Sequence, residues 1–246
     1  NGADMIRPDV MQAFVDAFGD AGFKASAFLP SYGLAETTLA VSIMPPGEGI
    51  QVELVEETEL TGHPGAPDRP IRYRAIVNCG RAVKDMTIEI RDENNAAVAD
   101  KIIGKVWCTG PSLMKEYFRD KESTDACLVD GWLDTGDMGY LSNGYIYIVG
   151  RAKDMIIING KNHWPQDIEW AVEQLPGFKA GDIAAFAVTM PGGEETGPAV
   201  DARQSRLVTL GLPATRRGWL GDSLTPSRTT TLAAGRSRTP AASSSL

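Results

Sequence analysis

The sequence predicts a mixed α/β and α+β chain with a larger β-rich part, residues 1–150, and a smaller part, residues 151–200. Three observations predict this organisation. An amphipathic helix pattern near the start is followed mainly by strand patterns, a charged connection interrupts them at residues 150–154, and the composition changes abruptly near Val200. The chain has 246 residues, of which 43% are hydrophobic, so it is long enough to bury a globular core.

The first 40 residues predict a helix, a short strand and a turn. Apolar residues recur with helical spacing from Pro8 to Phe18, and proline suits the first turn of a helix. Residues 26–29 predict a short buried strand, followed by a polar turn at residues 30–33 and a helical stretch from Ala35. Ligand contacts are common in a loop after a strand, so this turn is a candidate binding segment.

The next segment predicts an irregular insertion. Residues 45–70 contain five Pro and four Gly between acidic residues, which is typical of a long loop. We place the whole insertion at residues 42–78. Its composition alone indicates no function.

Strand patterns dominate the middle of the chain. Residues 87–91 and 105–109 alternate between apolar and polar side chains. Residues 138–141 and 145–149 flank an Asn-Gly pair, which favours a type I′ turn, and together they predict a β-hairpin.

The smaller part predicts two strands around one helix. The strands cover residues 155–158 and 183–188. The helix begins at Pro165, carries Asp167 near its positive end and finishes near Gly177.

Composition and charge exclude several classes of protein. With 32 acidic and 24 basic residues, the formal charge is -8, which disfavours a broad surface for nucleic acid or anionic membrane. Two histidines exclude a multi-histidine zinc site, and the absence of a run of about 18 apolar residues predicts no transmembrane segment. The three cysteines, Cys79, Cys108 and Cys127, form no CxxC pair, which favours reduced thiols and a cytoplasmic location.

Both ends of the chain are unusual. The chain starts at Asn1 without an initiator Met, and we expect it to begin inside a longer fold. Residues 201–246 contain 7 Arg, 2 Asp and no Lys or Glu, so they carry a formal charge of +5 and residues 1–200 carry -13. With 14 Ser or Thr and little apolar periodicity, this tail predicts no core. It is interpreted as a natural disordered tail or, as we prefer, as translation of GC-rich DNA in a wrong reading frame.

The first of three chemically suggestive segments is Ser31–Thr38. It combines an aromatic ring at Tyr32, a permissive backbone at Gly33 and a carboxylate at Glu36. The ring can stack on a nucleotide base, and the carboxylate can help to hold Mg²⁺ against phosphates. The alternative is a helix-capping turn with a core tyrosine.

The second segment, Gly131–Asp137, directly precedes the predicted hairpin. A carboxylate in such a loop can accept two hydrogen bonds from a ribose diol. Asp-Thr-Gly also occurs in aspartic proteases, but only one copy is present here. As a structural alternative, Asp137 caps a turn.

The third segment covers residues 150–154 and continues through residues 160–169. Arg151 and Lys153 can meet phosphate or carboxylate oxygens, and a short charged connection can serve as a hinge. The alternative is a solvated salt-bridge turn. His163 has no partner serine or cysteine and is interpreted as a packing or hydrogen-bonding residue.

Together the three segments resemble the adenylate-forming superfamily of acyl-CoA synthetases, luciferases and peptide-synthetase adenylation domains, most closely its fatty-acyl-AMP ligases. Tyr32–Thr38 looks like the adenine and magnesium motif, Thr135–Asp137 like the ribose motif and Gly150–Asp154 like the hinge motif. Residues 162–169 are especially similar to the ligase branch. The resemblance covers about residues 1–200.

The resemblance implies a domain organisation. Residues 1–150 would be the C-terminal part of the large AMP-binding domain, with a ligase-type insertion at residues 42–78. Residues 151–200 would be the start of the small, mobile lid domain, truncated near Val200, and residues 201–246 would be the anomalous tail.

The resemblance also implies an ATP or AMP site with Mg²⁺. Its cofactor-binding residues would be Gly2, Ala3, Tyr32, Gly33, Asp137 and Arg151. Tyr32 would pack on adenine and Asp137 would bind both ribose hydroxyls. Glu36 would bind Mg²⁺ and act with Arg151 in catalysis, and Lys153 would be the pivot of the lid.

The implied reaction is attack of a fatty carboxylate on the α-phosphate of ATP, which gives acyl-adenylate and pyrophosphate. The acyl group would pass to the phosphopantetheine thiol of an acyl carrier protein or polyketide synthase carrier domain, in lipid or polyketide biosynthesis. The 46 residues between Tyr32 and Cys79 are similar in length to the ligase-specific insertion, and this resemblance implies an acyl-AMP ligase in preference to an acyl-CoA synthetase. A non-catalytic nucleotide-binding module is the other alternative.

Two expected parts of the family are missing. The phosphate loop would lie upstream of Asn1, and no lysine follows Lys179 to supply the family's late catalytic lysine. We therefore predict that the 246-residue chain alone does not form acyl-adenylate.

Overall fold

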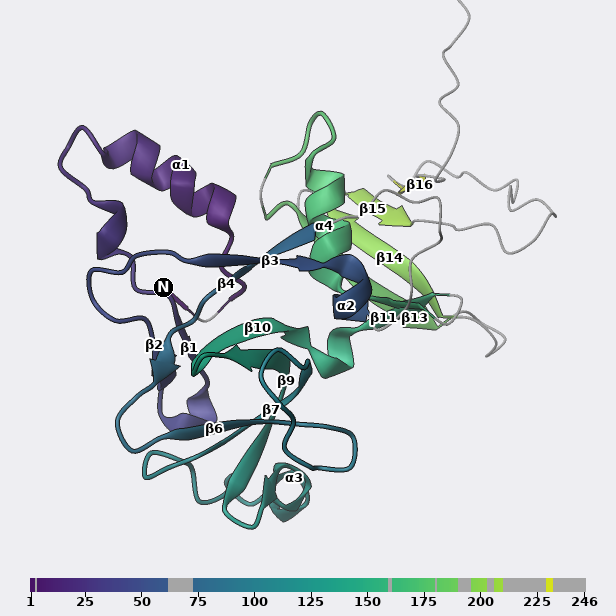
Figure 1. Ribbon diagram of the computed structural model, residues 1–246. Coiled ribbons are helices and arrows are strands. Elements are labelled where there is room, and N and C mark those ends of the chain that lie inside the picture. Colours follow the sequence, from purple (N-terminus) through teal and green to yellow (C-terminus); the bar gives the residue numbers. More distant parts are fainter. Residues whose placement is uncertain are drawn as a thin grey trace, which may run out of the picture. The chain divides into compact units, whose positions relative to one another are not determined.

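Figure 1 shows the computed structural model, which describes residues 1–2, 4–61, 73–158, 161–179, 181–189, 196–202, 206–209 and 229–231. The chain divides into two compact units, Asn1–Lys153 and Asp154–Leu246. Each unit has its own sheets and its own buried cluster, and the mixed α/β and α+β class is confirmed. Within these described ranges, no helix is long and apolar enough to span a membrane.

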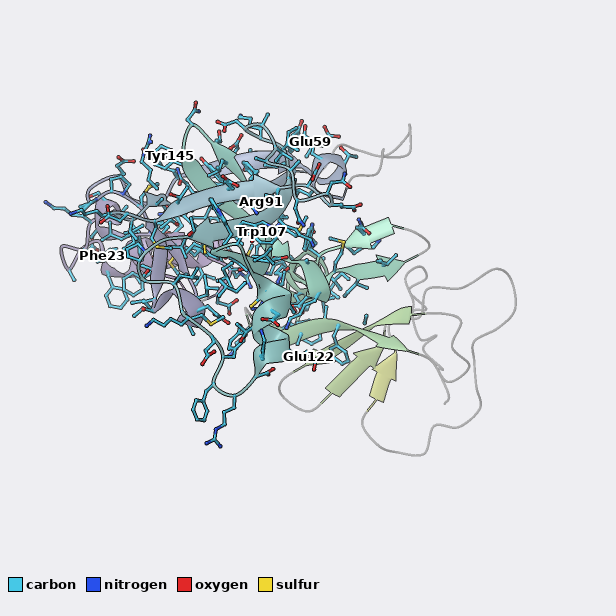
Figure 2. All side chains as sticks on the ribbon, turned by 90° about the horizontal axis from the view of Figure 1, so that it is seen from below. Phe23, Glu59, Arg91, Trp107, Glu122 and Tyr145 are labelled. Carbon is cyan, nitrogen blue, oxygen red and sulfur yellow. The ribbon has the colours of Figure 1, made fainter. Side chains whose placement is uncertain are left out.

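Helix α1 covers Pro8–Phe18, which confirms the predicted helix. None of its residues is fully buried. Its apolar face instead meets aromatic rings from the segment that follows: the Phe14 ring centroid lies 5.0 Å from that of Phe23, which Figure 2 labels, and 5.8 Å from that of Phe28. This small aromatic cluster fixes the helix on the first unit.

A three-stranded antiparallel sheet, ordered β1-β2-β5, carries the first candidate segment. Its strands are β1 (Ser31–Gly33), β2 (Ala40–Ile43) and β5 (Arg81–Ala82). The predicted strand at residues 26–29 is wrong, because Ala25–Ala27 forms the 3-10 helix η1. Strand pairing starts later, where Ser31 pairs with Ile43 of β2, so the predicted turn at residues 30–33 is mostly strand.

The predicted insertion contains regular structure. Strand β3 (Val52–Glu56) pairs antiparallel with β4 (Tyr73–Val77), and helix α2 covers Glu57–Thr61. The prediction of an entirely irregular loop at residues 45–70 is therefore wrong for these elements. The Pro and Gly residues that suggested a loop flank β3 and α2, and those in 62–72 lie outside the described residues.

A five-stranded antiparallel sheet, ordered β10-β9-β7-β6 with β8 beside β9, forms the larger sheet of the first unit. Its elements are β6 (Thr87–Arg91), β7 (Gly104–Thr109), helix α3 (Lys121–Cys127), β8 (Leu128–Val129), β9 (Trp132–Ser142) and β10 (Tyr145–Arg151). The predicted hairpin is confirmed, because Asn143 and Gly144 have the φ values of 52° and 78° that a type I′ turn requires.

One arginine links three strands of this sheet. The Arg91 guanidinium on β6 lies 4.6 Å from the ring centroid of Trp107 on β7, and Figure 2 labels both residues. It also lies 4.5 Å from the ring centroid of Trp132 on β9. Such cation–π contacts help to fix neighbouring strands in register.

The core of the first unit draws on both sheets. It contains Tyr32, Val41, Cys79, Met86, Ile90, Val106, Cys108, Leu133 and Ile146. Burying each large apolar side chain of this kind contributes about 1.5–3 kcal/mol relative to its exposure. Tyr32 thus belongs to the core as well as to the first candidate segment.

The second unit contains one described helix and six described strands. These elements are β11 (Ile156–Ile158), β12 (Lys161–His163), α4 (Pro165–Glu173), β13 (Ile183–Thr189), β14 (Thr196–Ala202), β15 (Arg206–Thr209) and β16 (Thr229–Thr231). The predicted helix start at Pro165 is confirmed, and the predicted strand at residues 183–188 is confirmed as β13. The core consists of Ile156, Val172, Ile183 and Ala185.

Two of these strands lie in the segment interpreted as a tail. β15 pairs antiparallel with β14, and β16 pairs parallel with β15. The other residues beyond Ala202 lie outside the described ranges. The interpretation of residues 201–246 as disordered or frame-shifted stays a prediction.

Candidate functional site

The first and second candidate segments meet in the first unit. The Tyr32 hydroxyl on β1 donates to Asp137 Oδ2 on β9 at 2.7 Å. The Tyr32 side chain is only 8% exposed. Burial first, and then the negative charge of Asp137, raises the pKa of Tyr32 well above its usual range, so the phenol remains a donor. The structure therefore joins the predicted adenine residue to the predicted ribose residue.

The backbone beside Asp137 is a bulge within β9 rather than the predicted loop. The pairing of β9 with β7 changes register between Lys105 and Trp107. Gly136 has a φ of 73°, which glycine adopts without a steric penalty, and its N–H donates to Asp134 Oδ1 at 3.0 Å. A bulge of this kind redirects a side chain, which fits a functional role for Asp137.

Arg151 lies on the opposite strand of the hairpin. It ends β10 and is in register with Asp137 across the β9–β10 pair. Its Nε atom is 3.4 Å from Asp137 Oδ1, and its side chain is 51% exposed. The Asp137 carboxylate thus contacts Tyr32 through one oxygen and Arg151 through the other.

Glu36 lies on a single 3-10 turn, η2 (Ala35–Thr37), instead of the predicted helical stretch. The stretch ends at Thr38, whose φ of 71° is incompatible with a continuing helix. The Glu36 backbone carbonyl accepts a hydrogen bond from the Met114 N–H at 2.7 Å. Its carboxylate faces the loop that precedes α3.

Sequence reasoning missed Tyr117, which holds the Glu36 carboxylate. The Tyr117 hydroxyl donates to Glu36 Oε1 at 2.6 Å. This hydrogen bond is the main reason that the pKa of Tyr117 is raised, and partial burial adds to it. Tyr117 lies 81 residues beyond Glu36, so no local pattern could have indicated the contact.

Cys108 is a second residue that sequence reasoning did not place in the site. It is fully buried on β7, and burial, followed by the charges of Glu36 and Asp137, raises its pKa to about 12. A thiol with this pKa stays protonated near neutral pH, so it is not a nucleophile.

Two glycines of the predicted site lie close to backbone. A Cβ at Gly33 would overlap the Leu39 carbonyl oxygen, so β1 and β2 can approach there only with glycine. A Cβ at Gly2 would lie 2.8 Å from the Ser31 carbonyl oxygen. Ala3 lies outside the described residues.

The third candidate segment spans the division between the two units. Lys153 is exposed on the 3-10 helix η3 (Ala152–Asp154), and it is the last residue of the first unit. His163 is partly buried on β12, where it pairs with Ile156 of β11. Of the residues in this segment, Arg151 is the one that the structure places beside Asp137 within the first unit.

The described residues fit one kind of Mg²⁺ coordination, in which a single protein carboxylate acts together with phosphates and water. No cluster of three or more His, Cys, Asp or Glu side chains suited to a metal occurs among the residues that the structure describes. Mg²⁺ is commonly held by one or two carboxylates together with substrate phosphates and water. A single partly buried carboxylate at Glu36 fits that mode, whereas a metal cage made only of protein groups does not fit.

These groups define a class of site. A buried phenol, a ribose-type carboxylate and a guanidinium form one connected group, and a second carboxylate follows on the next turn of the chain. Such a set can bind a nucleotide through its base, sugar and phosphates. The candidate site is therefore of the nucleotide-binding class.

Comparisons with known proteins give the family. Residues 1–118 match the family described as AMP-binding enzyme. A putative acyl-CoA synthetase of Caulobacter vibrioides is 42% identical over 207 residues, which cover 82% of this chain and 36% of the relative. A second relative is JamA of Moorena producens, which is named a medium-chain-fatty-acid–[acyl-carrier-protein] ligase. It is 34% identical over 79% of this chain and 35% of its own length.

A solved structure agrees with these relatives. A chain from a study of fatty acyl-adenylate ligases of E. coli and L. pneumophila matches with a TM-score of 0.69 and 40% identity, covering 85% of this chain and 36% of that one. The present chain resembles part of the AMP-binding, adenylate-forming enzymes, as predicted. It spans about a third of the length of the curated relatives that it matches.

Proposed function

We propose that the protein to which this chain contributes is a fatty-acyl-AMP ligase. It would join a fatty carboxylate to the α-phosphate of ATP, release pyrophosphate, and pass the acyl group to the phosphopantetheine thiol of an acyl carrier protein or polyketide synthase carrier domain. The single observation that carries the proposal is the connected group of Tyr32, Asp137 and Arg151. A cytoplasmic location and a role in lipid or polyketide biosynthesis belong to the same proposal.

Nucleotide binding is the first task of these residues. Each carboxylate oxygen offers about two lone-pair positions. In this proposal the ribose hydroxyls donate to the Asp137 carboxylate, which also contacts Tyr32 and Arg151. In this proposal Tyr32 packs against adenine, with Gly33 beside it, and Gly2 and Ala3 line the edge of the base.

Charge neutralisation is the second task. The fatty carboxylate and the phosphates are both negative, so their approach needs nearby positive charge. Arg151 is half-exposed and its guanidinium can turn toward the nucleotide from Asp137. Glu36 would hold Mg²⁺, which neutralises phosphate charge when it is bound. No side chain is assigned as a nucleophile, because the substrate carboxylate has that role.

Lys153 is proposed as the pivot of a mobile lid. The first compact unit ends at this residue and the second begins at Asp154, which supports a hinge at residues 150–154. Hinge residues are commonly found at the ends of elements. The large-domain and lid assignments of residues 1–150 and 151–200 are proposals of the same kind.

An acyl-AMP ligase is favoured over an acyl-CoA synthetase by the insertion. The segment between Tyr32 and Cys79 holds 46 residues and includes the ordered pair β3–β4. The alternative is kept because the Caulobacter relative is named a putative acyl-CoA synthetase. The two functions differ in the acceptor, a carrier-protein thiol or CoA.

A chimera with JamA tests the proposed function. The segment of JamA that aligns with this chain is replaced by the corresponding residues of this chain, and unmodified JamA is the positive control. With fatty acid and ATP, we expect acyl-AMP and pyrophosphate, followed by acyl transfer to a phosphopantetheinylated carrier protein. The chimera with Asp137→Asn should lose acyl-AMP formation while keeping its circular dichroism spectrum.

Other results of this experiment would contradict the proposal. Preferential formation of acyl-CoA would support the synthetase alternative. AMP binding without turnover, in the presence of all the JamA segments, would support a non-catalytic nucleotide-binding module. The unmodified 246-residue chain should form no acyl-AMP, and fatty-acid-dependent AMP release by that chain would contradict this expectation.

A further inference from the structure

The Glu36 carboxylate accepts a hydrogen bond from a residue outside the three candidate segments. Tyr117 lies in the segment between β7 and α3, and its hydroxyl donates to Glu36 Oε1 at 2.6 Å. An O–H to carboxylate hydrogen bond of this length is charge-assisted and among the stronger types in proteins. The bond leaves the second oxygen, Oε2, without this donor.

Three hydrogen bonds connect the loop that carries Tyr117 to the turn that carries Glu36. The Thr38 hydroxyl donates to the Ser112 carbonyl oxygen at 3.2 Å. The Met114 N–H donates to the Glu36 carbonyl oxygen at 2.7 Å. With the Tyr117 hydroxyl bond, both the backbone and the side chain of Glu36 are fixed by the same loop.

Tyr117 is itself fixed by the start of α3. Its N–H donates to the hydroxyl oxygen of the buried Thr124 at 2.9 Å, and that hydroxyl donates to the Asp120 carbonyl oxygen at 2.7 Å. Asp120 also caps α3, because its Oδ1 accepts from the Ser123 N–H at 3.0 Å. The backbone of Tyr117 is thus held in place by hydrogen bonds to the N-terminal cap of α3.

We propose that Tyr117 is a positioning residue that holds the Glu36 carboxylate in the orientation needed to bind the Mg²⁺ of an ATP complex. The inference rests on the proposed function, because that function assigns Mg²⁺ to Glu36. Outer hydrogen-bond partners orient metal ligands, and their loss weakens metal binding even though they never touch the ion. Tyr117 performs this task through Oε1 and leaves Oε2 for the cation.

The alternative is that the Tyr117 hydroxyl only stabilises the loop, and this alternative predicts a different result for ATP binding. The test uses the full 246-residue chain, with ATP titrated by calorimetry in MgCl2 and, separately, in EDTA. Tyr117→Phe removes only the hydroxyl. The matched control is Tyr145→Phe: Tyr145, labelled in Figure 2, is also partly buried and its hydroxyl lies 3.5 Å from a glutamate oxygen, that of Glu48.

The positioning role predicts a loss confined to the magnesium condition. Tyr117→Phe should weaken ATP binding about tenfold in MgCl2, at the lower end of the usual cost of losing an outer partner of a metal ligand. Binding in EDTA should be unchanged, and Tyr145→Phe should match the unmodified chain in both conditions. Equal weakening in both conditions, or no weakening in either, would overturn the inference while leaving nucleotide binding intact. Absence of ATP binding by the unmodified chain in MgCl2 would overturn the inference for this chain, whereas the proposed function is tested separately by the JamA chimera.

A second measurement tests the contact without nucleotide. The absorbance change of tyrosinate formation, taken as the difference between the unmodified chain and Tyr117→Phe, isolates the titration of Tyr117. Glu36→Gln should move that titration to lower pH, because it removes the charged acceptor. An unchanged titration would show that the two side chains are not in contact in solution, and it would overturn the inference independently of the proposed function.

Discussion

Two tyrosine–carboxylate pairs in the first unit have nearly the same hydrogen-bond length but different surroundings. Tyr32 donates to Asp137 at 2.7 Å from within the core, and Tyr117 donates to Glu36 at 2.6 Å from a partly buried loop. Burial is the main cause of the raised pKa of Tyr32, whereas the hydrogen bond is the main cause for Tyr117. The Tyr32 ring is therefore part of the folding core, whereas the Tyr117 ring lies outside the buried cluster.

The largest difference should appear when each ring is removed. Tyr32→Ala should lower the free energy of unfolding by about 3–5 kcal/mol, as for other large aromatic side chains truncated in a core. Tyr117→Ala should cost much less, because its ring is not part of the buried cluster. Urea denaturation followed by tryptophan fluorescence measures both. Equal losses would contradict the distinction between the pairs.

Removal of the hydroxyl groups alone should give a smaller difference of the same sign. Tyr32→Phe removes one hydrogen bond to a partly buried carboxylate, which should cost about 1–3 kcal/mol. Tyr117→Phe should cost less than about 1 kcal/mol, because water can replace the donor at a half-exposed site. The same urea denaturation experiment measures both losses of unfolding free energy. A larger loss for Tyr117→Phe than for Tyr32→Phe would contradict the comparison.

The pH dependence of the two pairs should differ in its response to substitution. Both tyrosines have a raised pKa, so each pair contributes its stability fully below the unfolded tyrosine pKa of about 10 and loses it as pH rises through the higher folded value. Glu36→Gln should return the pKa of Tyr117 most of the way to its usual value. Asp137→Asn should leave the pKa of Tyr32 clearly raised, because burial remains.

Tyrosinate absorbance measures this prediction, with the corresponding Phe variants as references. Loss of the entire shift of Tyr32 in Asp137→Asn would mean that charge, and not burial, dominates that pair. The two tyrosines would then be equivalent, and the core assignment of Tyr32 would need revision.

Cysteine alkylation gives the smallest expected effect and tests the burial of the core that contains Tyr32. Cys108 is fully buried with a pKa raised to about 12, whereas Cys127 is partly buried. In the native chain, iodoacetamide should modify Cys127 before Cys108. Mass spectrometry of peptides after timed quenching measures the order. Faster modification of Cys108 would show that the core around Cys108 is open to solvent.

The sequence predicted elements whose signal is local. The helix Pro8–Phe18, the strand Thr87–Arg91 and the start of α4 at Pro165 follow from periodicity and proline within one short window. The hairpin follows from one Asn-Gly pair. The candidate residues Tyr32, Glu36, Asp137 and Arg151 were found because each lies in a short motif.

The missed features depend on partners far along the chain. Ser31–Gly33 is too short for a periodic signal and becomes a strand through pairing with β2. Val52–Glu56 becomes a strand through pairing with β4, across residues that lie outside the described ranges. Tyr117 contacts Glu36 across 81 residues. In each case the contact that determines the structure joins residues too far apart in the sequence to give a local pattern.

The most direct test of the central claim is an AMP titration of the 246-residue chain, followed by calorimetry or ligand-observed NMR. The claim is that Tyr32, Asp137 and Arg151 form one nucleotide site. We predict saturable AMP binding that Asp137→Asn weakens about tenfold, the equivalent of one charged hydrogen-bonding interaction. The absence of AMP binding, or equal binding by Asp137→Asn, would contradict the claim.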